Sequence, residues 1–177
     1  MTVSTGSIAL FAVLFLLPGQ GKPPAGVPEN LRVPEGERLV LQAHAEGFQI
    51  YVCQASAEQK LSWVFKAPEA KLLDRKGATI GQHYGGPAWK HKDGSEVTGK
   101  VAARHDAPEA DSIPWLLLTA AGHSGSGLLS RVTTIQRLHT KGGQPPAGGC
   151  EESKRGTESK VPYTADYYFY ASAQGSR

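Results

Sequence analysis

The sequence has little that a helical protein needs. Its 21 glycines and 12 prolines interrupt nearly every window, and no stretch keeps a 3.6-residue apolar repeat for three turns. It also has no strand–GxGxxG–helix unit and no alternation of strands with helices. These absences exclude a helical bundle and a dinucleotide-binding fold, and no motif for any other cofactor is present. We therefore expect no cofactor.

The chain also lacks a run of charge of one sign. Its 19 basic and 16 acidic residues are scattered, giving a net charge of +3. The basic pair Lys154-Arg155 stands close to Glu151 and Glu152. No phosphate-binding stripe results, so we expect no nucleic-acid partner.

Cysteine and asparagine are scarce. The two cysteines, Cys53 and Cys150, have no CxxC spacing, which excludes a structural zinc site of the usual kind. In an exported protein they would form one disulfide; in a reducing compartment they would remain two free thiols. The only asparagine, Asn30, precedes Leu-Arg, so the chain has no N-glycosylation acceptor.

Residues 1–21 predict export. They carry no charged side chain and contain an apolar run, 8–17, which has the length of a signal-peptide core and is too short to span a bilayer. Gly19-Gln20-Gly21 then offers a cleavage site, and residues 22–30 read as a Pro-rich linker. We predict a signal peptide at 1–21, a secreted or periplasmic location and a mature chain without a membrane span. A buried first strand is the alternative for this run.

Alternating apolar and polar residues predict strands throughout the remaining chain. Leu39, Leu41, Ala43 and Ala45 alternate with polar side chains, Gly47 interrupts the pattern, and alternation resumes over 48–53, which suggests a first hairpin. Residues 67–70 (Ala-Pro-Glu-Ala) suggest one helical turn. Further strands are expected at 61–66, 78–80, 88–92, 96–102, 115–119, 128–138 and 165–171.

Asp93-Gly94 is a strong hairpin signal between two of these runs. Together the segments predict a single all-β domain over 31–171, followed by a flexible tail at 172–177. The architecture would be a β-sandwich or barrel of about eight to ten short, mostly antiparallel strands with long Gly/Pro-rich loops.

The most distinctive chemistry lies in the Gly-rich segment 80–95. Glycines there would let a ligand approach the backbone, and Trp89 could stack on a sugar ring. We predict a non-catalytic binding module for a glycan or cell-surface component. The candidate ligand-binding residues are His83, Tyr84, Trp89, Asp93 and Tyr168.

Two other functions remain open. One is a secreted enzyme centred on this segment, either metal-dependent through His83 with His91 or His123, or hydrolytic through Asp93. No His-x-His or His-x₃-His spacing occurs, so we predict no metal site. The other is a structural surface protein without a small ligand, which would bury both His83 and Trp89. The oligomeric state is not predicted.

Several motifs recur in one order along the chain and together resemble the DUF3455 family of exported bacterial and fungal proteins. They are Tyr51-Val-Cys53, Trp63, Leu73-Asp74-x-x-Gly77, Ile80-Gly-x-His83-Tyr-x-Gly86-Pro-x-Trp89, Asp93-Gly-Ser-x-Val97-x-Gly99, Trp115-Leu-Leu-Leu118, Ile135-Gln-Arg137, Thr140-x-Gly-Gly143, Cys150 and Val161-Pro-Tyr163-x-Ala-x-Tyr-x-Phe-Tyr170.

The resemblance covers residues 27–171. It implies export and a Cys53–Cys150 disulfide, and supplies no catalytic residues. Some fungal members carry the label malate dehydrogenase, which nothing in this sequence supports.

Overall fold

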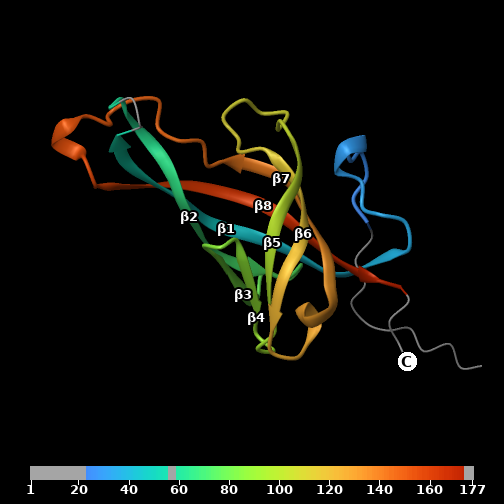
Figure 1. The fold of residues 1–177 in the computed structure, drawn as a ribbon. Helices are drawn as coiled ribbons and strands as arrows, with labels where there is room; N and C mark the ends of the chain where they lie inside the picture. Colours follow the sequence, from blue (N-terminus) through green and yellow to red (C-terminus); the bar gives the residue numbers. More distant parts are fainter. Residues whose placement is uncertain (1–22, 56–58, 174–177) are drawn as a thin grey trace, which may run out of the picture.

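The computed structural model describes residues 23–55 and 59–173. Eight strands form one antiparallel sheet that closes into a barrel, because β8 pairs with β1 (Figure 1). Every other strand pairs with its neighbours in the sequence. The strands are β1 Glu37–Ala55, β2 Leu61–Leu73, β3 Thr79–Tyr84, β4 Ala88–His91, β5 Glu96–His105, β6 Trp115–Ser124, β7 Val132–Gly142 and β8 Glu158–Ser172. The all-β prediction is confirmed, and of the two predicted architectures the barrel is the correct one.

Three local predictions are wrong. The strand expected at 128–138 begins only at Val132, because residues 128–131 form a 3₁₀ turn. Gly47 does not end a strand but lies within the 19-residue strand β1, paired with Ala70 on one side and Tyr163 on the other. Residues 67–70 form no helical turn but continue β2. Pro68 is tolerated there because its pairing with β1 is the only pairing it makes; β3 first pairs with β2 at Ala70.

The β3–β4 hairpin is much shorter than its neighbours and leaves the barrel wall incomplete. β3 pairs with β2 only over residues 70–73, and β4 pairs with β5 only over residues 96–98. β2 and β5 both extend past the turn at Gly86 and Pro87, where the short hairpin ends. Over that length no strand lies between β2 and β5. The predicted Asp93-Gly94 hairpin is confirmed at the other end of this unit, where Gly94 has a φ of 90°.

Hydrophobic side chains fill the interior of the barrel. Trp89, Tyr167 and Phe169 are the largest fully buried residues in the interior. A second cluster lies on the outside of the sheet, where Leu31 of the 3₁₀ helix η1 (Glu29–Leu31) packs with Tyr168 and other apolar side chains. Two further 3₁₀ turns, η2 (Leu128–Arg131) and η3 (Glu152–Lys154), complete the fold. The end of the predicted 22–30 linker therefore packs against the barrel.

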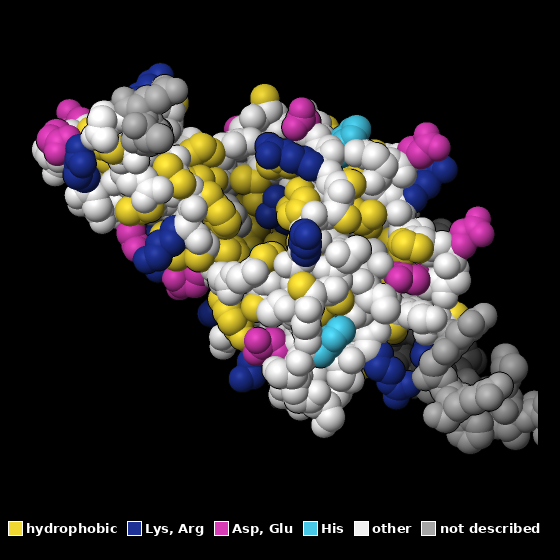
Figure 2. All heavy atoms as spheres, viewed as in Figure 1, with side chains coloured by type: hydrophobic (Ala, Val, Ile, Leu, Met, Phe, Trp, Pro, Cys, Tyr) yellow, Lys and Arg dark blue, Asp and Glu magenta, His cyan; other side chains and the backbone are white. Residues whose placement is uncertain are grey.

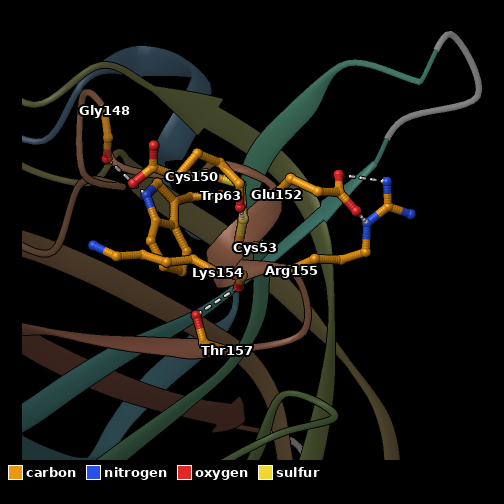
Figure 3. The surroundings of a disulfide bond; sticks show 9 residues. Cys53, Trp63, Gly148, Cys150, Glu152, Lys154, Arg155 and Thr157 are labelled. Atoms are coloured by element: carbon orange, nitrogen blue, oxygen red, sulfur yellow. Dashed lines mark hydrogen bonds and ion pairs between the residues drawn. A yellow bond between two sulfur atoms is a disulfide. The ribbon is translucent and has the colours of Figure 1, made fainter.

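The predicted disulfide is confirmed. Cys53 at the end of β1 is bonded to Cys150, 97 positions later, with their Cα atoms 5.3 Å apart (Figure 3). Nearby, the Trp63 indole N–H donates to the Gly148 carbonyl at 2.9 Å. The loop between β7 and β8 is thereby held against the far end of β1 and β2.

Some predictions concern parts of the chain that the structure leaves undescribed. The signal peptide at 1–21 lies outside the described residues, as does most of the predicted tail at 172–177. No helix within 23–55 or 59–173 is long and apolar enough to cross a membrane.

Candidate ligand-binding pocket

A pocket of about 600 Å³ opens where the barrel wall is incomplete. Figure 2 shows a hollow on this face, with hydrophobic side chains around it and Lys or Arg side chains in and beside it. Its apolar walls come from β2, β5, β6 and their connections: Phe65, Pro68, Pro87, Val101, Ile113, Pro114, Leu116 and Leu118. The volume lies within the range of typical small-molecule sites.

His83 and Trp89 meet at the inner side of this pocket. They are opposite each other in the β3–β4 ladder, and their rings stack with centroids 4.5 Å apart and planes 5° apart. Trp89 also contacts the Tyr167 ring edge-on, at 5.4 Å. Only 3% of His83 and 1% of Trp89 is exposed. The structure therefore brings these two predicted residues together, but inside the barrel and not on its surface.

The His83 ring is neutral at ordinary pH. Burial lowers the pKa of His83 to about 3, an effect opposed by its hydrogen bond to the Ala88 carbonyl and reinforced by the nearby Arg137 cation. The Nδ1–O distance is 2.8 Å. Because a carbonyl oxygen can only accept, Nδ1 carries the proton and Nε2 is left as an unprotonated acceptor.

This lowered pKa makes stability depend on His83 in mild acid. Between pH 6.5 and about 3 the unfolded chain binds a proton that the folded chain does not, so stability falls as pH falls. The slope from this group is about 1.4 kcal/mol per pH unit. In urea titrations from pH 6 to 4.5, His83→Phe, which keeps an aromatic ring beside Trp89, should lose that component of the slope. Equal slopes in the variant and the wild type would contradict a neutral buried His83.

Four polar groups in the barrel interior are buried and make no hydrogen bond of ordinary geometry, although the two tyrosine hydroxyls lie near each other and near the Gln49 and Trp89 donors. They are Gln49 Nε2, Trp89 Nε1 and the hydroxyls of Tyr163 and Tyr167. Burial raises the pKa of both tyrosines, so their hydroxyls stay protonated and can donate. Three of the four residues line the pocket, and Tyr163 is close enough to Tyr167 to affect its pKa. Unpaired buried donors are rare because each costs roughly 1–3 kcal/mol.

Three basic residues line this pocket, and of these Arg137 of β7 is half-buried whereas Lys66 and Arg104 are exposed. Arg137 Nε and Nη2 donate to the Pro114 carbonyl at 3.1 and 2.8 Å. No carboxylate pairs with it among the described residues. Its charge nevertheless lowers the pKa of His83 and, against the larger effect of burial, those of the two interior tyrosines.

The other predicted ligand-binding residues lie elsewhere. Tyr84 is on the opposite face of β3 from His83, and its hydroxyl donates to Glu96 at 2.6 Å. Tyr168 is buried in the outer cluster with Leu31. Neither lines the pocket.

Asp93 holds the β4–β5 turn to the start of η2. It accepts hydrogen bonds from the backbone N–H groups of Ser95 and Leu128, at 2.9 and 2.8 Å, and lies 3.0 Å from His91 Nδ1. Burial opposes its ionisation, but these contacts outweigh that effect and hold the pKa of Asp93 well below its usual range. The geometry gives Asp93 a structural task.

The three histidines weighed as metal ligands are also separate. Each has a ring nitrogen engaged: His83 with Ala88, His91 with Asp93, and His123 Nε2 with the Val132 carbonyl at 2.8 Å. Within 23–55 and 59–173, no group of three or more His, Cys, Asp or Glu residues could hold a metal ion.

Sequence reasoning missed Gln49 and Arg137. The alternation over 48–53 did not show which of its two faces is inward; in β1, Gln49, Tyr51 and Cys53 are buried and Phe48 is exposed. Arg137 carried a usable signal. It lies two residues after Ile135, which faces the core, so strand alternation places its charge on the same inward face.

The fold and the site define an eight-stranded antiparallel barrel with an internal, basic and largely apolar pocket. The chain belongs to the family described as protein of unknown function (DUF3455), whose model matches residues 34–171. No curated protein and no solved structure is significantly similar to it.

Proposed function

We propose that this protein is a non-catalytic binding protein that holds a small, mainly apolar organic molecule in the barrel pocket. The observation that carries the proposal is a cavity of about 600 Å³ bordered by buried donors without partners. A molecule in this cavity would cover its apolar walls and accept hydrogen bonds from the unpaired groups.

The unpaired donors distinguish binding from a purely structural role. A structural role explains why His83 and Trp89 are buried. It explains less well why the Trp89 N–H and the Tyr167 hydroxyl, which are close to each other, make no hydrogen bond of ordinary geometry beside an open cavity. A core built only for stability would satisfy or exclude such groups.

The lining residues favour binding over catalysis. No carboxylate, thiol or aliphatic hydroxyl is among the described residues that line the pocket. The paired carboxylates of a glycoside hydrolase and a serine, threonine or cysteine nucleophile are therefore not found there. Asp93, the residue on which the predicted hydrolase depended, is committed to its turn.

The glycan ligand favoured by the sequence finds less support than an apolar ligand. Stacking on a sugar requires an accessible ring face, and Trp89 is fully buried with one face covered by His83. A glycan could reach Trp89 only through the pocket, whose walls are mostly hydrophobic.

A secreted or periplasmic location is part of the proposal. The disulfide supports it, since such bonds persist in oxidising compartments and are rare in reducing ones. A ligand-binding barrel there would act as a carrier or scavenger of its ligand.

The proposal can be tested with N-phenyl-1-naphthylamine, a neutral probe that fluoresces in apolar surroundings. Leu116 lines the pocket, whereas Leu117 on the same strand packs against the outer cluster. We expect the wild type and the Leu117→Trp control to bind the probe, and Leu116→Trp, which fills part of the cavity, to bind it at least about tenfold more weakly.

Circular dichroism and thermal unfolding would establish that both variants fold. Absence of probe binding by the wild type, or equal binding by the two tryptophan variants, would contradict a ligand site in this pocket.

A further inference from the structure

We infer that the ligand carries a compact anionic head group, such as a carboxylate, and that Arg137 binds it. This inference rests on the proposed function, because it names the class of molecule that the same pocket takes. Its basis is the charge inside the cavity and the geometry of the groups around that charge.

The charge of the lining is entirely of one sign. Three basic residues, Lys66, Arg104 and Arg137, line the pocket, and no acidic residue does so among those the structure describes. Lys66 is paired outside the pocket with Glu158. Arg137 has no such partner, so its positive charge faces the cavity uncompensated.

Arg137 is held in a fixed orientation with donors to spare. Two of the five N–H groups of its guanidinium donate to the single carbonyl of Pro114. The guanidinium also lies close enough to the Tyr167 hydroxyl to lower the pKa of that group, and the N–H groups that do not bond Pro114 can donate to a ligand. A guanidinium recognises oxyanions better than most other groups because its planar N–H groups match two oxygens at once.

The groups near Arg137 also favour an anion. The Tyr167 hydroxyl, the Trp89 indole N–H and the Gln49 amide N–H are all donors on residues that line the pocket. None makes a hydrogen bond of ordinary geometry, although Trp89 and Arg137 are close enough to the Tyr167 hydroxyl to lower its pKa. A carboxylate is acceptor-only and can take about four hydrogen bonds, so it suits a site that offers mainly donors. The hydrophobic walls from Phe65 to Leu118 would enclose the rest of the molecule.

A neutral ligand would leave the cation partly desolvated without compensation. Covering the pocket removes water from Arg137, and a buried charge is costly unless it is paired and hydrogen-bonded. An anion that enters with the apolar body restores this pairing, and we therefore expect selection for amphiphilic anions over neutral molecules of the same shape.

The test uses two probes with the same aromatic body. 8-Anilinonaphthalene-1-sulfonate is anionic, and N-phenyl-1-naphthylamine lacks only the sulfonate. Both would be titrated at about 0.15 M ionic strength into the wild type, Arg137→Gln and Arg137→Lys. Arg38→Gln is the control, since Arg38 is an exposed residue of β1 outside the pocket and its loss changes the net charge equally.

We expect Arg137→Gln to weaken binding of the anionic probe about 10- to 100-fold, as for loss of a charge-assisted hydrogen bond. Binding of the neutral probe should stay the same or become tighter, because the variant no longer has a cation to desolvate, and retained binding also shows that the variant is folded. Arg137→Lys should give an intermediate loss, and Arg38→Gln should match the wild type. Naphthalene-2-carboxylate should displace the anionic probe better than naphthalene-2-carboxamide does.

The anion site would be overturned if Arg137→Gln weakened binding of both probes equally. It would also be overturned if Arg38→Gln weakened binding of the anionic probe as much as Arg137→Gln does. In either case the pocket would remain a binding site. Failure of both probes to bind the wild type would overturn the proposed function itself, and the anion site with it.

Discussion

Gly47→Ala should destabilise this barrel by about 3 kcal/mol or more, and complete failure to fold would agree with the same reasoning. A Cβ atom at Gly47 would lie 2.1 Å from the Glu69 carbonyl oxygen and 2.5 Å from the Ala70 Cα. Both are backbone atoms of the paired strand β2, so no side-chain rotation can relieve the collision. The measurement is the free energy of unfolding in urea, followed by circular dichroism.

Gly148→Ala is the matched control for this change. A Cβ there would meet nothing within 4 Å, and the φ angle of Gly148 does not fall in the left-handed region. Its free energy of unfolding should stay within about 0.5 kcal/mol of the wild type. A loss below about 1 kcal/mol for Gly47→Ala would contradict the close approach of β1 and β2 at this position.

Removing the disulfide should have an effect of similar size. Cys53→Ala with Cys150→Ala should lower the free energy of unfolding by about 2 to 5 kcal/mol, because the closed loop spans most of the barrel. Without the bond, the β7–β8 loop is held near β1 mainly by contacts such as Trp63 to Gly148. Urea unfolding with and without reductant is the measurement.

The reductant provides the control for this prediction. It should move the wild-type transition to that of the double variant and leave the variant itself unchanged. If the double variant were as stable as the oxidised wild type, the bond would contribute nothing to the fold, contrary to expectation. Neither cysteine lines the pocket, so probe binding by the folded variant should persist at low urea.

Strand periodicity was enough to identify the class of fold, but not the path of the chain. Alternation along 38–53 reveals two β-type runs, and a glycine between them is normally evidence for a turn. Whether the chain turns at Gly47 or continues as a strand depends on the strands beside it, and here β2 and β8 both pair with β1 at this position. The sequence also could not show that β2 accepts Pro68, because a strand accepts proline only where no second strand pairs with it on the other side.

The residues of the candidate site were also only partly predictable from the sequence. The sequence correctly drew attention to His83 and Trp89 because aromatic residues in a Gly-rich hairpin are unusual. It could not show that their shared strand face is the barrel interior. Gln49 and Arg137 lie in distant strands with ordinary surroundings in the sequence, and only closure of the sheet brings them to one cavity.

The sequence by itself determined the properties that depend on local pattern and composition: an all-β domain, the Asp93-Gly94 hairpin, the cysteine pair and the family. These follow from side-chain alternation, from turn chemistry and from the number of cysteines. The tertiary structure alone decided the pocket, its unpaired donors and the isolation of Arg137, because burial and the absence of a partner are properties of a residue's neighbours in space. Those neighbours are set by strand register around the barrel, which no short stretch of sequence contains.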